Sequence, residues 1–178
     1  MDTGIRTDRI EAVREIVSGL LEQVPDVSLR ASGYVHMFGV AEACVLLAMR
    51  RGEDIELAAA AGYLHDIATY TTGNAVDHAH RGSEMAKQIL QKAGIFSQEE
   101  IGKICQAVFF HSDKKMENGP LEELLKDADV LQHCLFDPGF VAKKEKDRFK
   151  KLKKELGIKK RLESNRADAA RRFTDLYL

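Results

Sequence analysis

Apolar residues recur three and four positions apart along nearly the whole chain, which is the pattern of helices with one buried face. No run of alternating apolar and polar residues stands out as a strand, and no internal repeat or low-complexity linker interrupts the pattern. The sequence therefore predicts an all-α protein. The first predicted helix covers residues 7–20, and its apolar positions are Ile10, Val13, Ile16, Val17 and Leu20.

Capping residues and helix breakers divide the rest of the chain into further helices. Ser32 can cap a second helix, Ser97 with Glu100 forms a capping signal, and Pro120 can open a helix at its first position. Residues 69–74 are polar and are predicted to form a loop. The helices predicted after the first span about residues 32–51, 54–68, 77–92, 97–111, 120–136, 143–161 and 162–178.

The length of the chain and the number and spacing of its cysteines limit the class of protein. A chain of 178 residues suits one domain, which can bury roughly two-thirds of its unfolded surface. Cys44, Cys105 and Cys134 are odd in number and widely spaced, which fits reduced thiols better than a disulfide framework. The N-terminal residues lack an apolar leader segment, and no apolar run approaches the length of a membrane span. We therefore expect a cytoplasmic protein with no membrane partner.

Positive charge is concentrated near the C-terminus. Residues 143–161 hold eleven Lys or Arg against three acidic residues, whereas the whole chain carries a net charge of −1. Phe149, Leu152 and Leu156 fall on one stripe of the helix predicted there, and the chain has no Trp to stack nucleic-acid bases. We interpret this helix as docked and amphipathic, and we do not expect nucleic acid as a partner. The expected organisation is a domain over residues 1–142 with a basic helical segment, residues 143–178, packed on it.

The adjacent residues His65 and Asp66 are the strongest chemical signal in the sequence. They end a helix of small and apolar residues, where burying an imidazole and a carboxylate requires a compensating partner. An ideal helix points adjacent side chains about 100° apart, so both can reach one centre only if the helix ends there. His36 lies upstream on a face of small residues, and Asp129 lies in an otherwise apolar helix. Imidazoles and carboxylates from several helices indicate a divalent transition metal.

The ordered set of His36, the His65-Asp66 pair and Asp129 resembles the HD-domain superfamily of metal-dependent phosphohydrolases, over roughly residues 30–135. Family members with two metals add two histidines between the pair and the last aspartate. The first is identified as His78, ahead of His80, because glycine follows four residues later; His111 is the second. The resemblance implies a compact HD-domain helical bundle with C-terminal amphipathic helices and a binuclear centre in which Asp66 bridges the ions and serves catalysis. The implied metal ligands are His36, His65, Asp66, His78, His111 and Asp129.

This resemblance also implies an activity, namely hydrolysis of a phosphate ester or anhydride of a small nucleotide-like substrate by metal-activated water. Mixed imidazole and carboxylate ligation suits one or two ions of Fe, Mn, Co, Ni or Zn, and the absence of cysteine ligands argues against a structural zinc site. Two alternatives stay open, a di-iron oxygenase of the HD type and a non-catalytic metal-binding sensor or scaffold. The expected partner is a small phosphorylated metabolite or nucleotide, and the sequence leaves the oligomeric state open, a homo-oligomer included.

Several polar residues near the implied ligands are weaker candidates. His133 follows Asp129 by one helical turn and is either a pocket residue or a core histidine, and Asp127 is an alternative to Asp129 as the ligand. No Arg closely follows His36, as it does in some relatives, so we do not expect a substrate contact from that position. Charged residues on such loops are often only solvated. The candidates for contacts with substrate phosphate oxygens at the rim of the site are His80, Arg81, Lys114 and Lys115.

Overall fold

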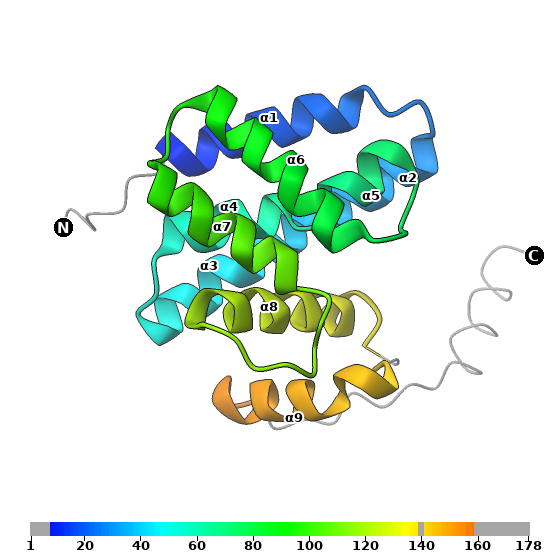
Figure 1. Cartoon of the computed structure of the whole chain (residues 1–178). Coiled ribbons are helices and arrows are strands. Elements are labelled where there is room, and N and C mark those ends of the chain that lie inside the picture. Colours follow the sequence, from blue (N-terminus) through cyan, green and yellow to red (C-terminus); the bar gives the residue numbers. More distant parts are fainter. Residues whose placement is uncertain (1–7, 139–140, 159–178) are drawn as a thin grey trace, which may run out of the picture.

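The structure is a computed structural model that describes residues 8–138 and 141–158, and every regular element within them is helical (Figure 1). The prediction of an all-α fold is confirmed, whereas the helix predicted over residues 162–178 lies outside the described residues. The helices are α1 (Asp8–Glu22), α2 (Val27–Gly33), the π-helix η1 (Tyr34–Phe38), α3 (Gly39–Arg51), α4 (Ile55–Leu64), α5 (Ile67–Thr72), α6 (His78–Ala93), α7 (Gln98–Phe110), α8 (Pro120–Phe136), the 3₁₀ turn η2 (Lys143–Glu145) and α9 (Lys146–Glu155).

Helix α4 forms the centre of the core, and α1, α3, α7 and α8 pack around it (Figure 1). All its residues from Leu57 to Leu64 are buried, so the helix has no solvent face over two turns. Gly62 lies against α3 so closely that a Cβ atom there would lie 2.6 Å from Cα of Ala41. This backbone contact brings the end of α4 beside the helical segment that carries His36.

Four predicted boundaries are wrong: the helix predicted over residues 54–68 is interrupted after Leu64, the one predicted over residues 143–161 ends at Glu155, and the other two errors have a cause in local hydrogen bonds. The helix predicted to begin at Ser32 begins at Val27, because the Asp26 carboxylate caps it by accepting from the backbone amides of Ser28 and Leu29. The loop predicted over residues 69–74 is helical up to Thr72. The hydroxyls of Thr71 and Thr72 donate to backbone carbonyls four residues earlier, which lets these polar residues continue the helix.

Other capping predictions are confirmed. Ser97 accepts from the backbone amide of Glu100 while the Glu100 side chain accepts from the backbone amide of Ser97, which is a complete capping box. Pro120 stands at the first position of α8, where its missing N–H leaves no helical hydrogen bond unmade. Helix α7 leads directly into His111 and α8 contains Asp129, so the positions of these helices place two of the expected ligands.

Helix α9 lies alongside α8 at the edge of the bundle (Figure 1). Phe149 and Leu152 are buried against the core, and the guanidinium of Arg148 donates to the carboxylates of Glu123 and Asp127 on α8 at 2.9 and 2.8 Å. Within the described residues, the basic segment therefore docks through its apolar side and one arginine, with most of its lysines on the outer face.

The continuous helical stretch Val27–Arg51 is 25 residues long and apolar enough, with a mean hydropathy of 1.4, to cross a membrane by length and composition. The sequence had not been expected to contain such a run. A core helix passes the same test, and half of this stretch's most apolar window is buried inside the molecule. Met37, Val40 and Leu47 have no exposed surface, so the stretch supplies core helices in this fold.

Candidate metal centre

The helix that carries His65 ends there, as the pair requires. Helix α4 stops at Leu64, and Asp66 adopts φ −114° and ψ 18°, which interrupts the helical path before α5 begins. The interruption turns two neighbouring side chains toward the same centre, and Nε2 of His65 lies 3.6 Å from Oδ2 of Asp66.

His36 lies on the π-helix η1, a widened turn of a kind that is rare in proteins and frequent at functional sites. Its Nδ1 lies 2.8 Å from Oε1 of Gln132 on α8, and its Nε2 lies 3.0 Å from Nε2 of His65. Gly39 makes room for this arrangement, since a Cβ atom there would lie 2.9 Å from the Gln132 side chain. No pattern in the sequence predicted the π-helix or the contact between Gln132 and His36.

A second pair of histidines faces the other oxygen of Asp66. Nε2 of His78, at the start of α6, lies 3.6 Å from Oδ1 of Asp66, and Nε2 of His111, which follows α7, lies 3.5 Å from the same oxygen. Helix α6 approaches closely because its Gly82 leaves only 3.0 Å between a hypothetical Cβ atom and the backbone oxygen of His65. The two carboxylate oxygens of Asp66 thus face two different groups of histidines, as those of a bridging carboxylate do.

Asp129 closes the centre from α8. Its Oδ1 lies 3.5 Å from Nε2 of His36, and its Oδ2 accepts a hydrogen bond from the Lys114 ammonium at 2.5 Å. Asp127, the alternative ligand, points elsewhere and pairs with Arg51 and Arg148. The structure therefore places Asp129, and not Asp127, at the centre.

All four histidines present the same nitrogen to the centre. Each Nδ1 lies near a carbonyl oxygen, that of Gln132 for His36 and backbone oxygens at 2.8 Å for His65, 3.1 Å for His78 and 2.6 Å for His111. A carbonyl can only accept, so Nδ1 carries the proton and the Nε2 lone pair points inward. Metal-binding histidines are oriented in this way by their outer hydrogen bond.

These donor atoms fit divalent cations. Oδ1 of Asp66 and Oδ1 of Asp129 are buried and have no hydrogen-bond partner among the residues that the structure describes. Facing lone pairs and unpartnered carboxylate oxygens repel one another unless a cation lies between them. Two ligands bound to one transition metal at about 2.1 Å lie ~3.0 to 3.4 Å apart, close to the separations found here.

Burial and charge set the protonation of the centre. Burial lowers the pKa of His65 to about 3, so its imidazole is neutral near pH 7. Burial alone would raise the pKa of Asp66, but the imidazoles around it, His65 foremost, outweigh burial and hold that pKa far below its usual range. The pKa of Asp129 is likewise lowered against its burial, chiefly by the Lys114 ammonium. The neutral imidazole of His65 and the two ionised carboxylates are in the protonation states that metal binding requires. At His36, burial would lower the pKa, but Asp66 and Asp129 outweigh burial and raise that pKa, so a cation competes with a proton there.

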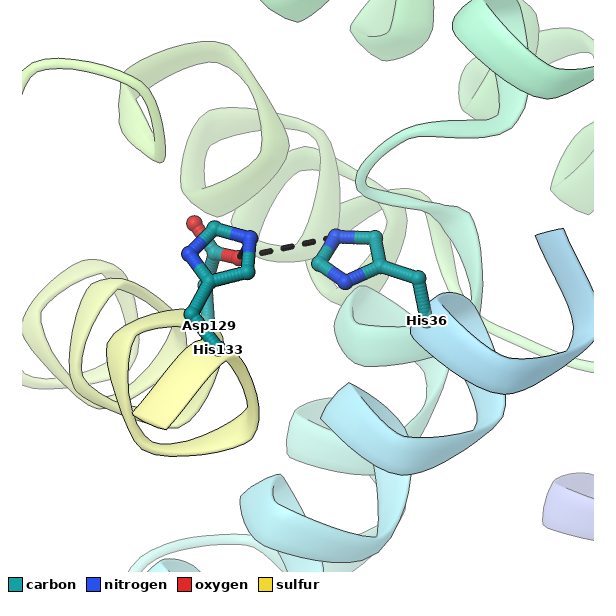
Figure 2. Close-up of side chains that lie close together, drawn as sticks. All are labelled: His36, Asp129 and His133. Carbon is teal, nitrogen blue, oxygen red and sulfur yellow. Dashed lines mark ion pairs between the residues drawn. The ribbon is translucent and has the colours of Figure 1, made fainter. Parts of the chain in front are cut away.

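Three groups of side chains bring donor atoms close enough together to hold an ion. Two of them correspond to the two sides of Asp66, and the third includes His133, which the sequence left undecided (Figure 2). The groups are His36 with His65 and Asp66, Asp66 with His78 and His111, and His36 with Asp129 and His133.

Two of the four predicted rim residues do not reach the centre. Nδ1 of His80 lies 2.8 Å from the carboxylate of Asp77, and its ring stacks on Phe109 at 4.1 Å between centroids. The Arg81 guanidinium donates to the Thr72 hydroxyl and to backbone oxygens of residues 74 and 76, so it holds the loop before α6. His80, two positions after His78, is turned by about 200° to the opposite face of the helix, whereas Arg81 lies near the face of His78 but its guanidinium is held by the loop before α6.

The two lysines of the predicted rim have different positions. The side chain of Lys114 is only 4% exposed and lies on Asp129, although the sequence suggested an open loop. Both lysines line a surface groove of about 650 Å³, whose other charged residues are Lys143, Arg148, Lys151, Glu117, Glu123 and Asp147. Of the two, only Lys114 also contacts an expected ligand.

A second pocket, of about 410 Å³, opens beside the centre. His36 and His133 form its polar side, and most of the remaining lining is apolar or aromatic. The residues that line it are Ala31, Ser32, Val35, His36, Tyr70, Gln132, His133 and Phe136.

A family model of the HD domain matches residues 33–133, which is more than half of the sequence. The chain therefore belongs to the HD-domain family, and the resemblance read from the sequence is confirmed. The matched residues span all six expected ligands and end at His133.

Known proteins similar to the chain include ribonuclease Y from Pelobacter propionicus, Geobacter sulfurreducens and Geobacter metallireducens. Each is 33% identical over 100 residues, which are 55% of this chain and 17% of the relative's length. The chain thus spans only a small part of these curated relatives. The crystal structure of a predicted HD superfamily hydrolase from an uncultured Thermotogales bacterium matches with a TM-score of 0.51 at 23% identity, over 84% of this chain and 88% of the other. That likeness shows the shared fold.

Proposed function

We propose that the chain is a metal-dependent phosphohydrolase that cleaves a phosphate ester or anhydride of a small nucleotide-like substrate. The observation that carries this proposal is the set of inward Nε2 atoms and unpartnered carboxylate oxygens around Asp66. Bound divalent cations would supply activation of water and neutralisation of phosphoryl charge. The residues that would hold them are His36, His65, Asp66, His78, His111 and Asp129.

Differences in exposure give the centre an inner and an outer side. The side chains of His65 and His111 are at most 2% exposed, whereas that of His78 is 30% exposed and that of Asp66 is 17% exposed. The buried residues exclude water from behind the centre and keep the ligands rigid. A phosphoryl group would approach from the side of Asp66 and His78.

The pocket beside His36 supports a nucleotide-like substrate. Its walls include Tyr70, the exposed Phe136 and the half-exposed Val35, which suit a flat, weakly polar group such as a base. Lys114 approaches the same centre from the other side of Asp129 and offers one positive charge near the reacting phosphoryl group.

The proposal includes the compartment in which the protein works. All three cysteines are free in the described part of the chain, and Cys44 and Cys134 are buried. Free, buried thiols support a reducing compartment such as the cytoplasm.

The test is a metal-dependent activity screen. Metal-free protein is loaded in turn with Mn, Fe, Co, Ni or Zn and assayed for phosphate release from a panel of nucleotides and other phosphorylated metabolites. A short oligoribonucleotide belongs in the panel because the relatives carry the name ribonuclease Y. Asp66→Asn is the control, since it keeps the side-chain shape but removes the negative charge. Oxygen consumption by the iron-loaded protein without phosphate release would instead support the oxygenase alternative.

A further inference from the structure

His133 lies on α8 one turn after Asp129, and its ring stacks on that of His36 with 5.0 Å between centroids and 10° between planes (Figure 2). Its Nε2 lies 3.4 Å from Oδ1 of Asp129. The side chain is 45% exposed, so packing alone does not require it to face the centre. Figure 2 shows these three side chains facing one another, with His36 on one helical segment and Asp129 and His133 together on another, which is α8.

The other nitrogen of His133 faces a buried carboxylate. Oε1 of Glu145, in the 3₁₀ turn η2, lies 3.3 Å from Nδ1 of His133, and the Glu145 side chain is 4% exposed. An ionised carboxylate can only accept, so it holds the proton on Nδ1 and leaves the Nε2 lone pair toward Asp129. Carboxylates orient many metal-binding histidines in this way. Glu145 lies twelve residues beyond the end of the HD-domain match.

The contact between His133 and Asp129 lacks the geometry of a hydrogen bond. Nε2 of His133 and Oδ1 of Asp129 lie 3.4 Å apart but lack the hydrogen-bond alignment that the 3.3 Å contact between Nδ1 of His133 and Glu145 has. Oδ1 of Asp129 also lacks a hydrogen-bond partner within the described residues. The Nε2 lone pair of His133 therefore faces an unpartnered carboxylate oxygen of Asp129, which is the arrangement also found at the other histidines of the centre.

From this geometry we propose that His133, oriented by Glu145, is an additional ligand of the ion held by His36 and Asp129. The inference rests on the metal centre of the proposed function and adds two residues to it. It makes the centre asymmetric, because the side with His36, His65 and Asp129 gains a fifth protein donor while the side with His78 and His111 keeps three. The basic C-terminal segment then contributes to metal retention through Glu145.

Metal affinity and stoichiometry test this inference. Metal-free protein is titrated with Mn²⁺ or Co²⁺ in competition with a chromophoric chelator. We expect His133→Ala and His133→Phe each to weaken the tighter ion at least ten-fold, because either change removes the donor nitrogen. Glu145→Gln should weaken the same ion by a smaller factor, since glutamine still accepts from Nδ1 but lacks the charge. His80→Ala is the matched control and should leave both affinities unchanged.

Two further readouts separate ligation from packing. Loss of a nitrogen donor should change the visible absorption of the Co²⁺-loaded protein, which a purely structural role would not do. His133→Phe retains a ring against His36, so wild-type affinity in this variant would overturn the inference. The Tm of the metal-free variants should stay within a few degrees of the wild type.

The outcomes distinguish the inference from the proposed function. If His133→Ala and His133→Phe bind both ions as tightly as the wild type while the wild type releases phosphate, the inference fails and the hydrolase proposal stands. If the affinity falls as expected but no substrate is hydrolysed, His133 is a ligand and the hydrolase proposal fails. A wild type that binds neither Mn²⁺ nor Co²⁺ overturns both.

Discussion

Nε2 of His36 and Nε2 of His65 lie 3.0 Å apart, although 29 residues separate the two histidines in the chain. The other nitrogen of each ring faces a carbonyl oxygen, so in the neutral form of both rings the two Nε2 lone pairs face each other. Two inward lone pairs at this distance destabilise the metal-free protein, and a cation between them removes the repulsion. Because an ion relieves this repulsion, metal binding can be measured as an increase in the stability of the folded protein.

Adding metal should therefore raise the Tm of the metal-free protein. An ion that binds only the folded state stabilises it by about 2.7 kcal/mol at 100 times its Kd. Thermal unfolding with and without Mn²⁺ or Zn²⁺ measures the shift. His80→Ala should show the full shift and His65→Ala almost none; an equal shift in both would mean that the ions bind elsewhere.

Replacing His65 or Asp66 by Ala should abolish metal retention and reduce turnover at least about 100-fold, because each removes a donor from the middle of the centre. Circular dichroism should show helical content close to that of the wild type, since Asp66 makes no capping hydrogen bond and His65 makes only one, to the Gly62 carbonyl in the last turn of α4. Elemental analysis of the purified variants and a phosphate-release assay measure the two losses. Wild-type turnover in either variant would contradict the mechanism.

The sequence was sufficient to select candidate ligands on strongly patterned helices, and the structure brings these residues close together. Asp129 stood out as a carboxylate in an apolar helix, and His65 and Asp66 as polar residues at the end of one. The choice of His78 over His80 rested on the position of Gly82, and the structure gives that glycine a physical role. Helix α6 can approach the backbone of His65 only because Gly82 has no side chain.

The residues that orient the candidate ligands could not be predicted from the sequence, because they act through contacts between elements that are distant in the chain. Gln132 reaches His36 across 96 positions, and Glu145 reaches His133 from a turn with no helical pattern of its own. Arg81 was predicted at the rim because it lies close to His78 in the sequence, but its guanidinium contacts the loop before α6. Helix boundaries failed where Asp26 and Thr72 made local hydrogen bonds that apolar periodicity does not record.

Gln132→Leu should weaken metal binding about ten- to 100-fold while leaving the fold intact. The change removes the acceptor that holds Nδ1–H of His36, so the ring loses its fixed tautomer and orientation. A chelator competition assay measures the affinity. Gln132→Glu restores an acceptor and should recover part of the loss. If both variants bind like the wild type, the contact does not orient His36.

The ion pair between Arg9 on α1 and Glu100 on α7 should stabilise the fold less in acid. The Arg9 guanidinium, which donates to Glu100 at 2.8 Å, lowers the pKa of that carboxyl to about 2. The unfolded chain protonates this group near its ordinary pKa of 4.5, so the contact stabilises the fold above that pH and loses its effect as the pH falls toward 2. The two side chains are only partly covered, at 23% and 27% exposed, so solvent still screens the pair and its contribution is on the order of 0.5 kcal/mol at low salt.

Urea unfolding at pH 6 and pH 3 tests this contribution. Glu100→Gln keeps the capping box of α7 and removes only the charge. The variant should be less stable than the wild type at pH 6, and the difference should shrink at pH 3. A difference that is constant across this range would assign the effect to the cap and not to the ion pair.

Gly62→Ala should lower both stability and metal affinity. The added Cβ atom would lie 2.6 Å from Cα of Ala41, and because that neighbour is backbone, α3 and α4 must move apart. Such overpacking costs about 1 to 3 kcal/mol, more than the ~1 kcal/mol that alanine gains over glycine in a helix. The movement also separates His65 from His36, so metal affinity should fall with stability.

Gly102→Ala, in α7, is the matched control, since no described atom beyond the helix's own backbone would lie within 4 Å of its new Cβ atom. It should raise the Tm without changing metal affinity, and a Gly62→Ala variant that does the same would show that the close approach of α3 and α4 does not set the spacing of the two histidines.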